Sequence, residues 1–171
     1  MSRLPIVLFG RPVLHAPTRP VEVFDDDLRR LVADLVETMA AAPGAGLAAN
    51  QVGVDLRLFV YDCGPGRRGC LVNPVLERLP GGLQDGEEGC LSAPGLAYAT
   101  PRALNVRCSG VDEHGVPQVV EATGYLARCF QHEVDHLDGT VYLERLGGKA
   151  RRQAERDVAN ASWHGRDVRY V

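Results

Sequence analysis

Gln131-His132-Glu133-Val134-Asp135-His136 is the segment around which this chain of 171 residues is best understood. On a helix, residues four apart lie on one face, so His132 and His136 can turn imidazole nitrogens toward a single metal ion. Glu133 follows the first histidine and lies within reach of a water on that ion, where it can act as a general base. The alternative is a helix with two surface histidines and a solvated acid, but the complete pattern favours a metal site.

The residues around this segment predict a buried helix. Gly124 precedes it and Gly139 follows it, which suits a break before the helix and a stop after it. Because a buried His-Glu-His cluster is costly without partners, a bound metal gives the cluster a physical reason. Apolar residues recur at helical spacing at Leu126, Cys129, Phe130, Val134 and Leu137.

A catalytic site of this type needs a third protein ligand and an open position for water. Downstream of the two histidines, the candidates are Glu144 and His164, the latter in a segment that looks like a surface tail. Upstream, Cys90 lies in a segment between Gly89 and Gly95, and a thiolate is a strong ligand for a soft or borderline metal. An isolated cysteine is also a common core residue, so the residues alone leave this choice open.

The segment from Gly44 to Gln51 places a carboxamide after two glycines and an apolar run. A helix C-cap followed by a loop explains Pro43 and Gly44 but not the carboxamide. Gln51 could instead donate a hydrogen bond to a developing oxyanion.

Three segments together resemble the signature motifs of peptide deformylases, in the family's order and at similar separations. The beginning of the chain, Ile6 to Val21, also resembles that family, and the likeness runs from about Pro5 to Arg145. The three segments are Gly44-Ala45-Gly46-Leu47-Ala48-Ala49-Asn50-Gln51, Glu88-Gly89-Cys90-Leu91-Ser92 and Gln131-His132-Glu133-Val134-Asp135-His136-Leu137-Asp138-Gly139.

The resemblance implies removal of the N-formyl group from formyl-methionyl peptides, with release of formate. It implies a metal held by Cys90, His132 and His136, and a general acid–base role for Glu133. It also implies oxyanion donors from the Gln51 side chain and the Leu91 backbone N–H. The substrate-binding residues that it implies are Gly44, Ala45, Gly46, Glu88, Arg128 and Cys129, the first three as a strand that pairs with the substrate backbone.

Ligand chemistry and resemblance indicate different metals. A Cys-His-His set by itself favours zinc. The resemblance implies one Fe2+ per chain, with Ni2+ or Co2+ as active substitutes and Zn2+ as a less active one.

Two other functions compete with deformylation. An H-E-x-x-H metallopeptidase shares the helix, although the Cys90 motif argues against it. A deformylase-like binding protein without turnover would have no need of Glu133 and Gln51.

Two positions depart from the family's pattern in the expected methionine pocket. Arg128 is charged where an apolar residue is usual, and Gly86 stands where a larger aliphatic residue is often found. We expect the Arg128 stem to form the pocket rim with its head in water, and Gly86 to widen the pocket.

The fold class that we expect is α+β, with small antiparallel or mixed sheets around the metal-binding helix, in one catalytic domain over residues 1–171. We expect a helical tail from about residue 148. One helix is expected after the N-cap region Asp25–Asp27, one between Gly124 and Gly139, and one from about Lys149 to Trp163. The expected strands are 57–62, 70–79, 105–112 and 117–123.

Composition excludes several classes of protein. The chain is 45% hydrophobic and 24% charged with a net charge of −3, which suits a globular protein and does not suggest a DNA-binding one. The only early apolar run, Pro5 to Phe9, is too short for a signal peptide or membrane span. Five cysteines without C-x-x-C spacing indicate a reducing compartment. We expect a cytoplasmic monomer that acts on N-formyl-Met nascent polypeptides.

Basic residues gather in the expected C-terminal helix, at Lys149, Arg151, Arg152 and Arg156. A solvated face balanced by Glu155 and Asp157 explains them. The resemblance adds a second possibility, which is association of this helix with the ribosome.

Overall fold

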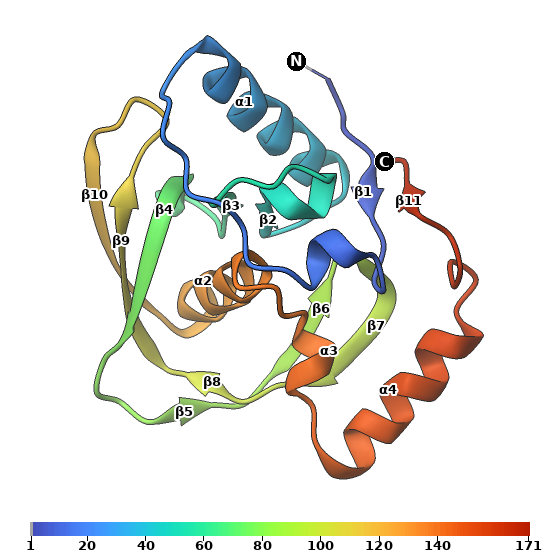
Figure 1. Ribbon diagram of the computed structural model, residues 1–171. Helices are drawn as coiled ribbons and strands as arrows, with labels where there is room; N and C mark the ends of the chain where they lie inside the picture. The colour runs from blue at the N-terminus through green and yellow to red at the C-terminus, as the bar shows by residue number, and fades with distance from the viewer. Residues whose placement is uncertain (1) are drawn as a thin grey trace.

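The computed structural model describes residues 2–171 and confirms the expected α+β class. One helix, α2 (Gly124–Leu137), runs through the middle of the molecule, and the strands wrap around it (Figure 1). The other helices are α1 (Asp26–Ala41), α3 (Tyr142–Arg145) and α4 (Gly148–Asn160), with short 3-10 helices η1 (Pro12–Leu14) and η2 (Ala49–Val52).

The largest sheet has five antiparallel strands in the order β10-β9-β4-β3-β2. The four expected strands are confirmed as β3, β4, β9 and β10 within one or two residues at their ends, and β2 was not among them. The strands of this sheet are β2 (Gly46–Ala48), β3 (Leu58–Asp62), β4 (Arg68–Arg78), β9 (Asn105–Val111) and β10 (Pro117–Thr123).

Three two-stranded sheets complete the structure. The first joins the two ends of the chain, which lie side by side in Figure 1, and the third carries the Cys90 segment. The pairs are β1 (Ile6–Val7) with β11 (Val168–Arg169), β5 (Leu83–Gln84) with β8 (Arg102–Ala103), and β6 (Glu87–Cys90) with β7 (Ala93–Ala99).

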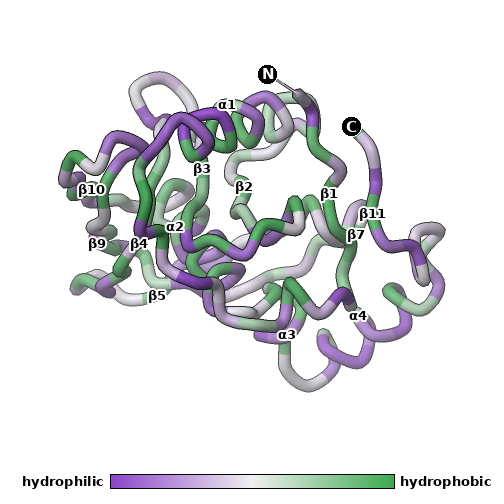
Figure 2. The backbone as a smooth tube through the Cα atoms, turned by 45° about the horizontal axis from the view of Figure 1, so that its top comes forward, coloured by the Kyte–Doolittle hydropathy of each residue, from purple (hydrophilic) through white to green (hydrophobic). Residues whose placement is uncertain are grey.

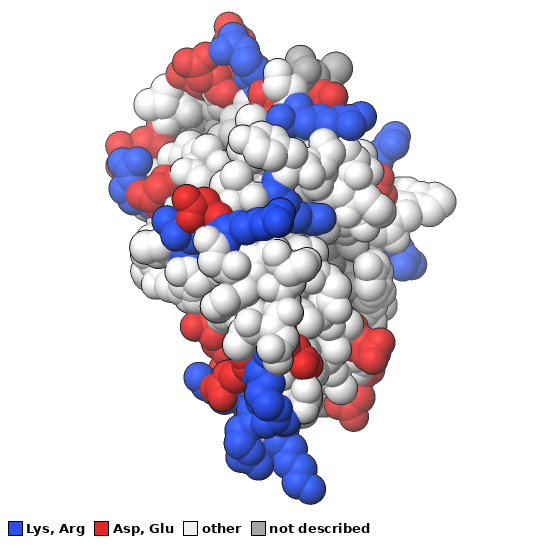
Figure 3. Space-filling model, turned by 90° about the vertical axis from the view of Figure 1, so that its right-hand side faces the viewer, with Lys and Arg blue, Asp and Glu red and all other residues white. Residues whose placement is uncertain are grey.

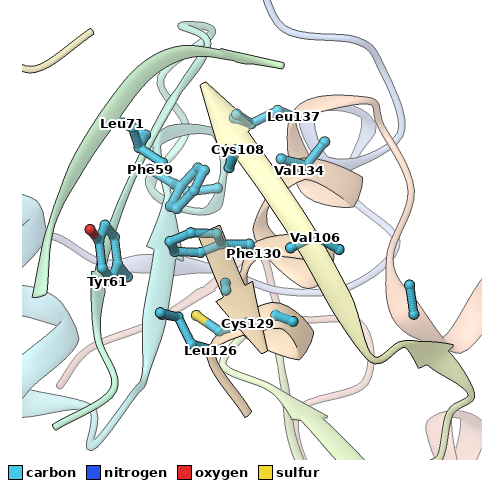
Figure 4. Close-up of a cluster of buried hydrophobic side chains, with 14 residues drawn as sticks. Phe59, Tyr61, Leu71, Val106, Cys108, Leu126, Cys129, Phe130, Val134 and Leu137 are labelled. Atoms are coloured by element: carbon cyan, nitrogen blue, oxygen red, sulfur yellow. The ribbon is translucent and has the colours of Figure 1, made fainter. Parts of the chain in front are cut away.

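Helix α2 is buried on all sides. Twelve of its 14 residues, Leu126 to Leu137, are buried, so the helix has no solvated face over its last three turns. Figure 4 shows its apolar side packed against the five-stranded sheet, with Phe130 close to both Phe59 and Tyr61. The Phe130 ring lies edge-on to Tyr61, 4.8 Å between centroids, a favourable aromatic geometry.

Glycines set both ends of α2. Gly124 begins the helix at φ +58°, and Gly139 follows it at φ +77°. At Gly139 a Cβ would also lie 2.7 Å from the backbone carbonyl carbon of Ala16, so the close approach of that segment requires glycine. The position of α2 is thereby fixed against the N-terminal part of the chain.

The last helix differs from its expected bounds. We expected it to continue to Trp163, but α4 ends at Asn160. Trp163 is buried and its indole Nε1 donates to the Pro94 carbonyl at 2.8 Å, so the chain turns inward before that residue. Helix α4 lies at the edge of the molecule and is largely hydrophilic (Figures 1 and 2), with Ala154 as its buried residue.

Within residues 2–171, no helix is both long enough and apolar enough to cross a membrane.

Candidate metal centre and substrate cavity

Cys90, His132 and His136 meet at one point, although 42 residues separate the cysteine from the first histidine along the chain. The His136 Nε2 atom lies 3.2 Å from Cys90 Sγ and 3.2 Å from His132 Nε2. Helix α2 presents the two imidazoles one turn apart, and the end of β6 brings the thiol to them. The other candidate ligands, Glu144 and His164, do not belong to this cluster.

The spacing of these three atoms suits a metal ion. Ligands about 2.0–2.3 Å from a tetrahedral metal lie a little over 3 Å from one another, as His136 Nε2 does from both of the other atoms, and all three atoms lie within 4.8 Å of one another. Two imidazole nitrogens and a sulfur that approach so closely are electron-rich, so a cation between them would relieve their repulsion. The residues present therefore fit a divalent metal with three protein ligands.

Glu88 orients the first of these histidines. Its Oε1 atom lies 2.7 Å from His132 Nδ1, which leaves Nε2 of that ring free to face the cluster. A carboxylate behind a metal-binding histidine fixes its tautomer and raises its basicity. Glu88 was expected among the substrate-binding residues. It lines the cavity, but its carboxylate oxygens are engaged by protein side chains.

A buried network of charges surrounds Glu88. Arg102 donates to Glu88 at 2.5 and 2.9 Å and to Asp135 at 2.6 Å, so Arg102 is not a surface residue. Burial raises the pKa of Glu88, but hydrogen bonds from Arg102 and His132 outweigh that effect and bring it to about 2. Arg145 also pairs with Asp135, whose carboxylate therefore lies in ion pairs and not in the ligand cluster.

The expectation for Arg128 was wrong in one respect. Arg128 does line the cavity, but its guanidinium is buried and donates to Glu88 at 3.0 Å and to the Thr100 carbonyl at 2.7 Å. Glu88 and the Thr100 carbonyl therefore hold the head inside the protein, where water was expected to surround it. Gly86 faces this guanidinium, because a Cβ there would lie 3.2 Å from Arg128 Nη2.

This arrangement also corrects the role expected of Gly86. It is not among the residues that line the cavity, so its missing side chain leaves room for the Arg128 head and does not widen the pocket.

Glu133 points into the centre from the same helix. Its side chain is buried, and its Oε2 atom has no hydrogen-bond partner among residues 2–171. Burial raises the pKa of Glu133 to about 7, which suits a group that must take up and release a proton near neutrality.

Gln51 reaches the centre from η2. Its Oε1 atom accepts from the Ala48 N–H at 2.9 Å, and its Nε2 atom donates to Ser92 Oγ at 3.2 Å and Cys90 Sγ at 3.5 Å. These contacts aim the amide N–H group at the ligand cluster.

Asn50, which sequence analysis did not single out, ties η2 to α2. Its Nδ2 atom donates to the His136 carbonyl at 2.6 Å. The only signal for it was its place beside Gln51 in the same motif.

A cavity of about 610 Å³ opens beside these groups. The edge strand β2 pairs with β3 on one side, and Gly44 and Gly46 line the cavity on the other. A Cβ at Gly46 would lie 2.3 Å from Glu133 Oε1 and 2.8 Å from Glu133 Cγ, so a side chain there would displace Glu133, whereas a Cβ at Gly44 would meet only the flexible end of Leu91, at 2.7 Å. An extended peptide could therefore approach the backbone of this segment closely.

Nearly all of the predicted site residues line this one cavity. His136 does not itself line the cavity, but its imidazole contacts Cys90 and His132, which do. The predicted residues that do line it are Gly44, Ala45, Gly46, Gln51, Glu88, Cys90, Leu91, Arg128, Cys129, His132 and Glu133.

A family model described as polypeptide deformylase matches residues 3–152 of the chain. The chain belongs to the peptide deformylase family. It is 52% identical over 169 residues to a peptide deformylase of Acidothermus cellulolyticus, covering 99% of this chain and 93% of the relative. It is 49% identical to one of Mycolicibacterium paratuberculosis, covering 95% and 91%.

Solved structures of the family share the fold. A peptide deformylase of Thermus thermophilus aligns with a TM-score of 0.85 at 46% identity, covering 91% of this chain and 93% of that one. One of Synechococcus elongatus, determined in complex with actinonin, aligns with a TM-score of 0.86 at 37% identity, covering 98% and 94%. The expected fold and family are thus confirmed.

Proposed function

We propose that this chain hydrolyses the N-formyl group of N-formyl-methionyl polypeptides and releases formate. The observation that carries this proposal is the Cys90, His132 and His136 cluster, which lies beside a cavity bordered by an open strand edge, in a chain of the deformylase family. The chain is a metal-dependent hydrolase, and its substrate is a peptide whose backbone lies along Gly44–Gly46.

Cys90, His132 and His136 would hold the metal, which supplies Lewis-acid activation of a water molecule when bound. Glu133 takes a proton from that water and later delivers it to the leaving amine. The unpartnered Oε2 atom and the raised pKa of Glu133 support this role.

The developing oxyanion needs hydrogen-bond donors, which we assign to the Gln51 side-chain amide and the Leu91 backbone N–H. Gln51 would exchange its contact with Ser92 or Cys90 for one with the substrate. Its own carbonyl stays bonded to Ala48, so the amide remains in place.

The methionine side chain would occupy the part of the cavity next to Cys129 and the stem of Arg128. The buried guanidinium closes this wall by its bonds to Glu88 and Thr100. Replacement of Gly86 by Ile should displace that guanidinium, so we expect kcat/KM for formyl-Met peptides to fall more than the preference for Met over Leu changes.

Fe2+ is the metal that we propose for the centre, with Ni2+ and Co2+ as active substitutes and Zn2+ as a less active one. A thiolate and two imidazoles can bind any of these four ions. Ligand type alone does not set which metal occupies the site in a cell. Protein prepared without oxygen and loaded with Fe2+ should exceed the zinc form in formate release. Equal turnover of the two forms would overturn the choice of iron.

Formate release from formyl-Met peptides, measured beside cleavage of casein, tests the reaction itself. We expect formate from the first substrate and no cleavage of the second. Casein cleavage without formate release would point to the metallopeptidase, and activity on neither substrate, with metal bound, would point to a binding protein.

We also propose that the chain acts as a cytoplasmic monomer near the ribosome. Lys149, Arg151, Arg152 and Arg156 are exposed on α4, and such charges would contact ribosomal RNA in a salt-dependent way. Ribosome co-sedimentation at low salt should weaken when these four residues are changed to Gln. Unchanged co-sedimentation would rule out α4 as the contact.

A further inference from the structure

The C-terminal strand places an arginine in the substrate cavity. Arg169 lies on β11, beyond residues 3–152 that the family model matches, yet it belongs to the cavity lining together with Cys90 and Glu133. Pairing of Ile6 with Arg169 and of Val7 with Val168 holds this strand in place. The C-terminal segment, which lies beyond the resemblance from Pro5 to Arg145, therefore contributes to the site.

Arg169 is anchored beside the metal centre by one nitrogen. Its Nε atom donates to the Leu91 carbonyl at 3.0 Å, and Leu91 follows Cys90 directly. No carboxylate among residues 2–171 forms an ion pair with this guanidinium. The remaining N–H groups of the side chain are thus available to a ligand in the cavity.

The other charged side chains of the lining do not compensate this cation. Glu88 and Arg128 are paired with each other, and Glu133 belongs to the centre. Glu87 is exposed and lies three residues before Cys90 on β6, which is about 10 Å along the strand. Figure 3 shows a band of basic side chains across the middle of the face that carries β11.

The two glycines of the Gly44–Gly46 segment indicate the direction in which a substrate would run. Gly46 lies against Glu133, at the reacting end, and Gly44 lies against Leu91, whose carbonyl holds Arg169. A peptide that pairs with this segment and begins at Gly46 therefore moves toward Arg169. At about 3.3 Å per residue, its second or third residue would come near the guanidinium.

We infer that Arg169 is a specificity-determining residue, which favours an acidic side chain at the second or third position of the formyl-methionyl peptide. This inference rests on the proposed deformylation. An exposed pair of charges has a modest effect, so the expected advantage of Glu over Lys is roughly three- to tenfold in kcat/KM at low salt. The advantage should shrink as salt is added.

The test measures formate release from formyl-Met peptides with Glu, Gln or Lys at the second position, and from a second series at the third. The wild-type chain is compared with Arg169→Gln and Arg169→Glu, and Arg166→Gln is the matched control. Arg166 is an exposed arginine of the same segment that does not line the cavity. Each result is expressed as the ratio of Glu to Lys peptide, because a general loss of activity cancels in that ratio.

We expect the wild type and Arg166→Gln to favour Glu in one series, Arg169→Gln to lose the preference and Arg169→Glu to reverse it. Equal use of Glu and Lys peptides by the wild type would overturn the inference. So would a uniform loss of activity in Arg169→Gln with an unchanged ratio, which would mean that Arg169 only holds the Leu91 backbone. Absence of formate from every peptide would instead contradict the proposed deformylation.

Discussion

Helices α2 and α4 are nearly equal in length, at 14 and 13 residues, and both carry several charged side chains. Twelve residues of α2 are buried, whereas Ala154 is the buried residue of α4. The charges of α2 must therefore be paired or held for a reaction, while those of α4 remain in water. The burial and pairing of a charged side chain therefore decide how much its removal changes stability or activity.

The largest effect should follow loss of the ligand that lies outside α2. Cys90→Ala leaves two histidines, so we expect metal content and formate release to fall to background. Cys70→Ala is the control, because burial raises the pKa of that thiol to about 12 and it lies outside the cluster. Metal analysis of both purified variants is the measurement, and a Cys90→Ala variant with a full metal complement would contradict the ligand assignment.

The loss of stability on removing one carboxylate can be compared directly between the two helices. Asp135→Ala on α2 removes a carboxylate partner from the buried Arg102, which keeps its pair with Glu88, so we expect a loss of about 1.5–3 kcal/mol in the free energy of unfolding. Glu155→Ala on α4 breaks an exposed pair with Arg151 and should cost at most about 0.5 kcal/mol. Urea unfolding of the two metal-loaded variants gives both values, and similar losses would refute the comparison.

Replacing one glycine near the metal centre and one near α4 by alanine allows the effects on kcat to be compared in the same way. A Cβ at Gly46 would lie 2.3 Å from Glu133 Oε1, so Gly46→Ala should displace the base. A misplacement of about 1 Å can reduce turnover on the order of 10²-fold. Gly147→Ala, just before α4, meets no atom within 4 Å and should leave kcat unchanged. Steady-state formate release decides between them, and a fully active Gly46→Ala variant would show that the segment can move away without cost.

The smallest effect is expected at an exposed charge of α4. Arg152→Ala should change the free energy of unfolding by no more than about 0.5 kcal/mol, since that side chain forms no ion pair within residues 2–171. Its formate release should match the wild type on short peptides. A loss above about 1 kcal/mol in urea unfolding would mean that α4 contributes contacts that its exposure does not suggest.

Local patterns predicted what depends on local geometry. The spacing of His132 and His136 required only a helix, and Gly124 and Gly139 bounded that helix correctly. The hairpin of β9 and β10 followed from apolar runs on both sides of a glycine turn. The ligand Cys90 came from resemblance, since nothing in its own spacing favoured it over Glu144 or His164.

The positions of the arginine side chains depend on pairing between distant parts of the chain, which the sequence alone does not reveal. The direction of the Arg128 head depends on Glu88, 40 residues before it, and the burial of Arg102 depends on Asp135, 33 residues after it. An arginine beside an apolar wall can reach water or a buried carboxylate equally well until that carboxylate is placed. Arg169 was missed for the same reason, because only the pairing of the two chain ends brings it to the cavity.

In the proposed mechanism Cys90, His132 and His136 hold the metal and Glu133 moves the proton, and one measurement tests this division of roles directly. Metal content and formate release are determined on the same anaerobic preparation of Glu133→Ala and of wild type. We predict a full metal complement in the variant, with turnover lower by roughly two to four powers of ten, the range for a general acid–base group. Near wild-type turnover at full metal content would contradict the account.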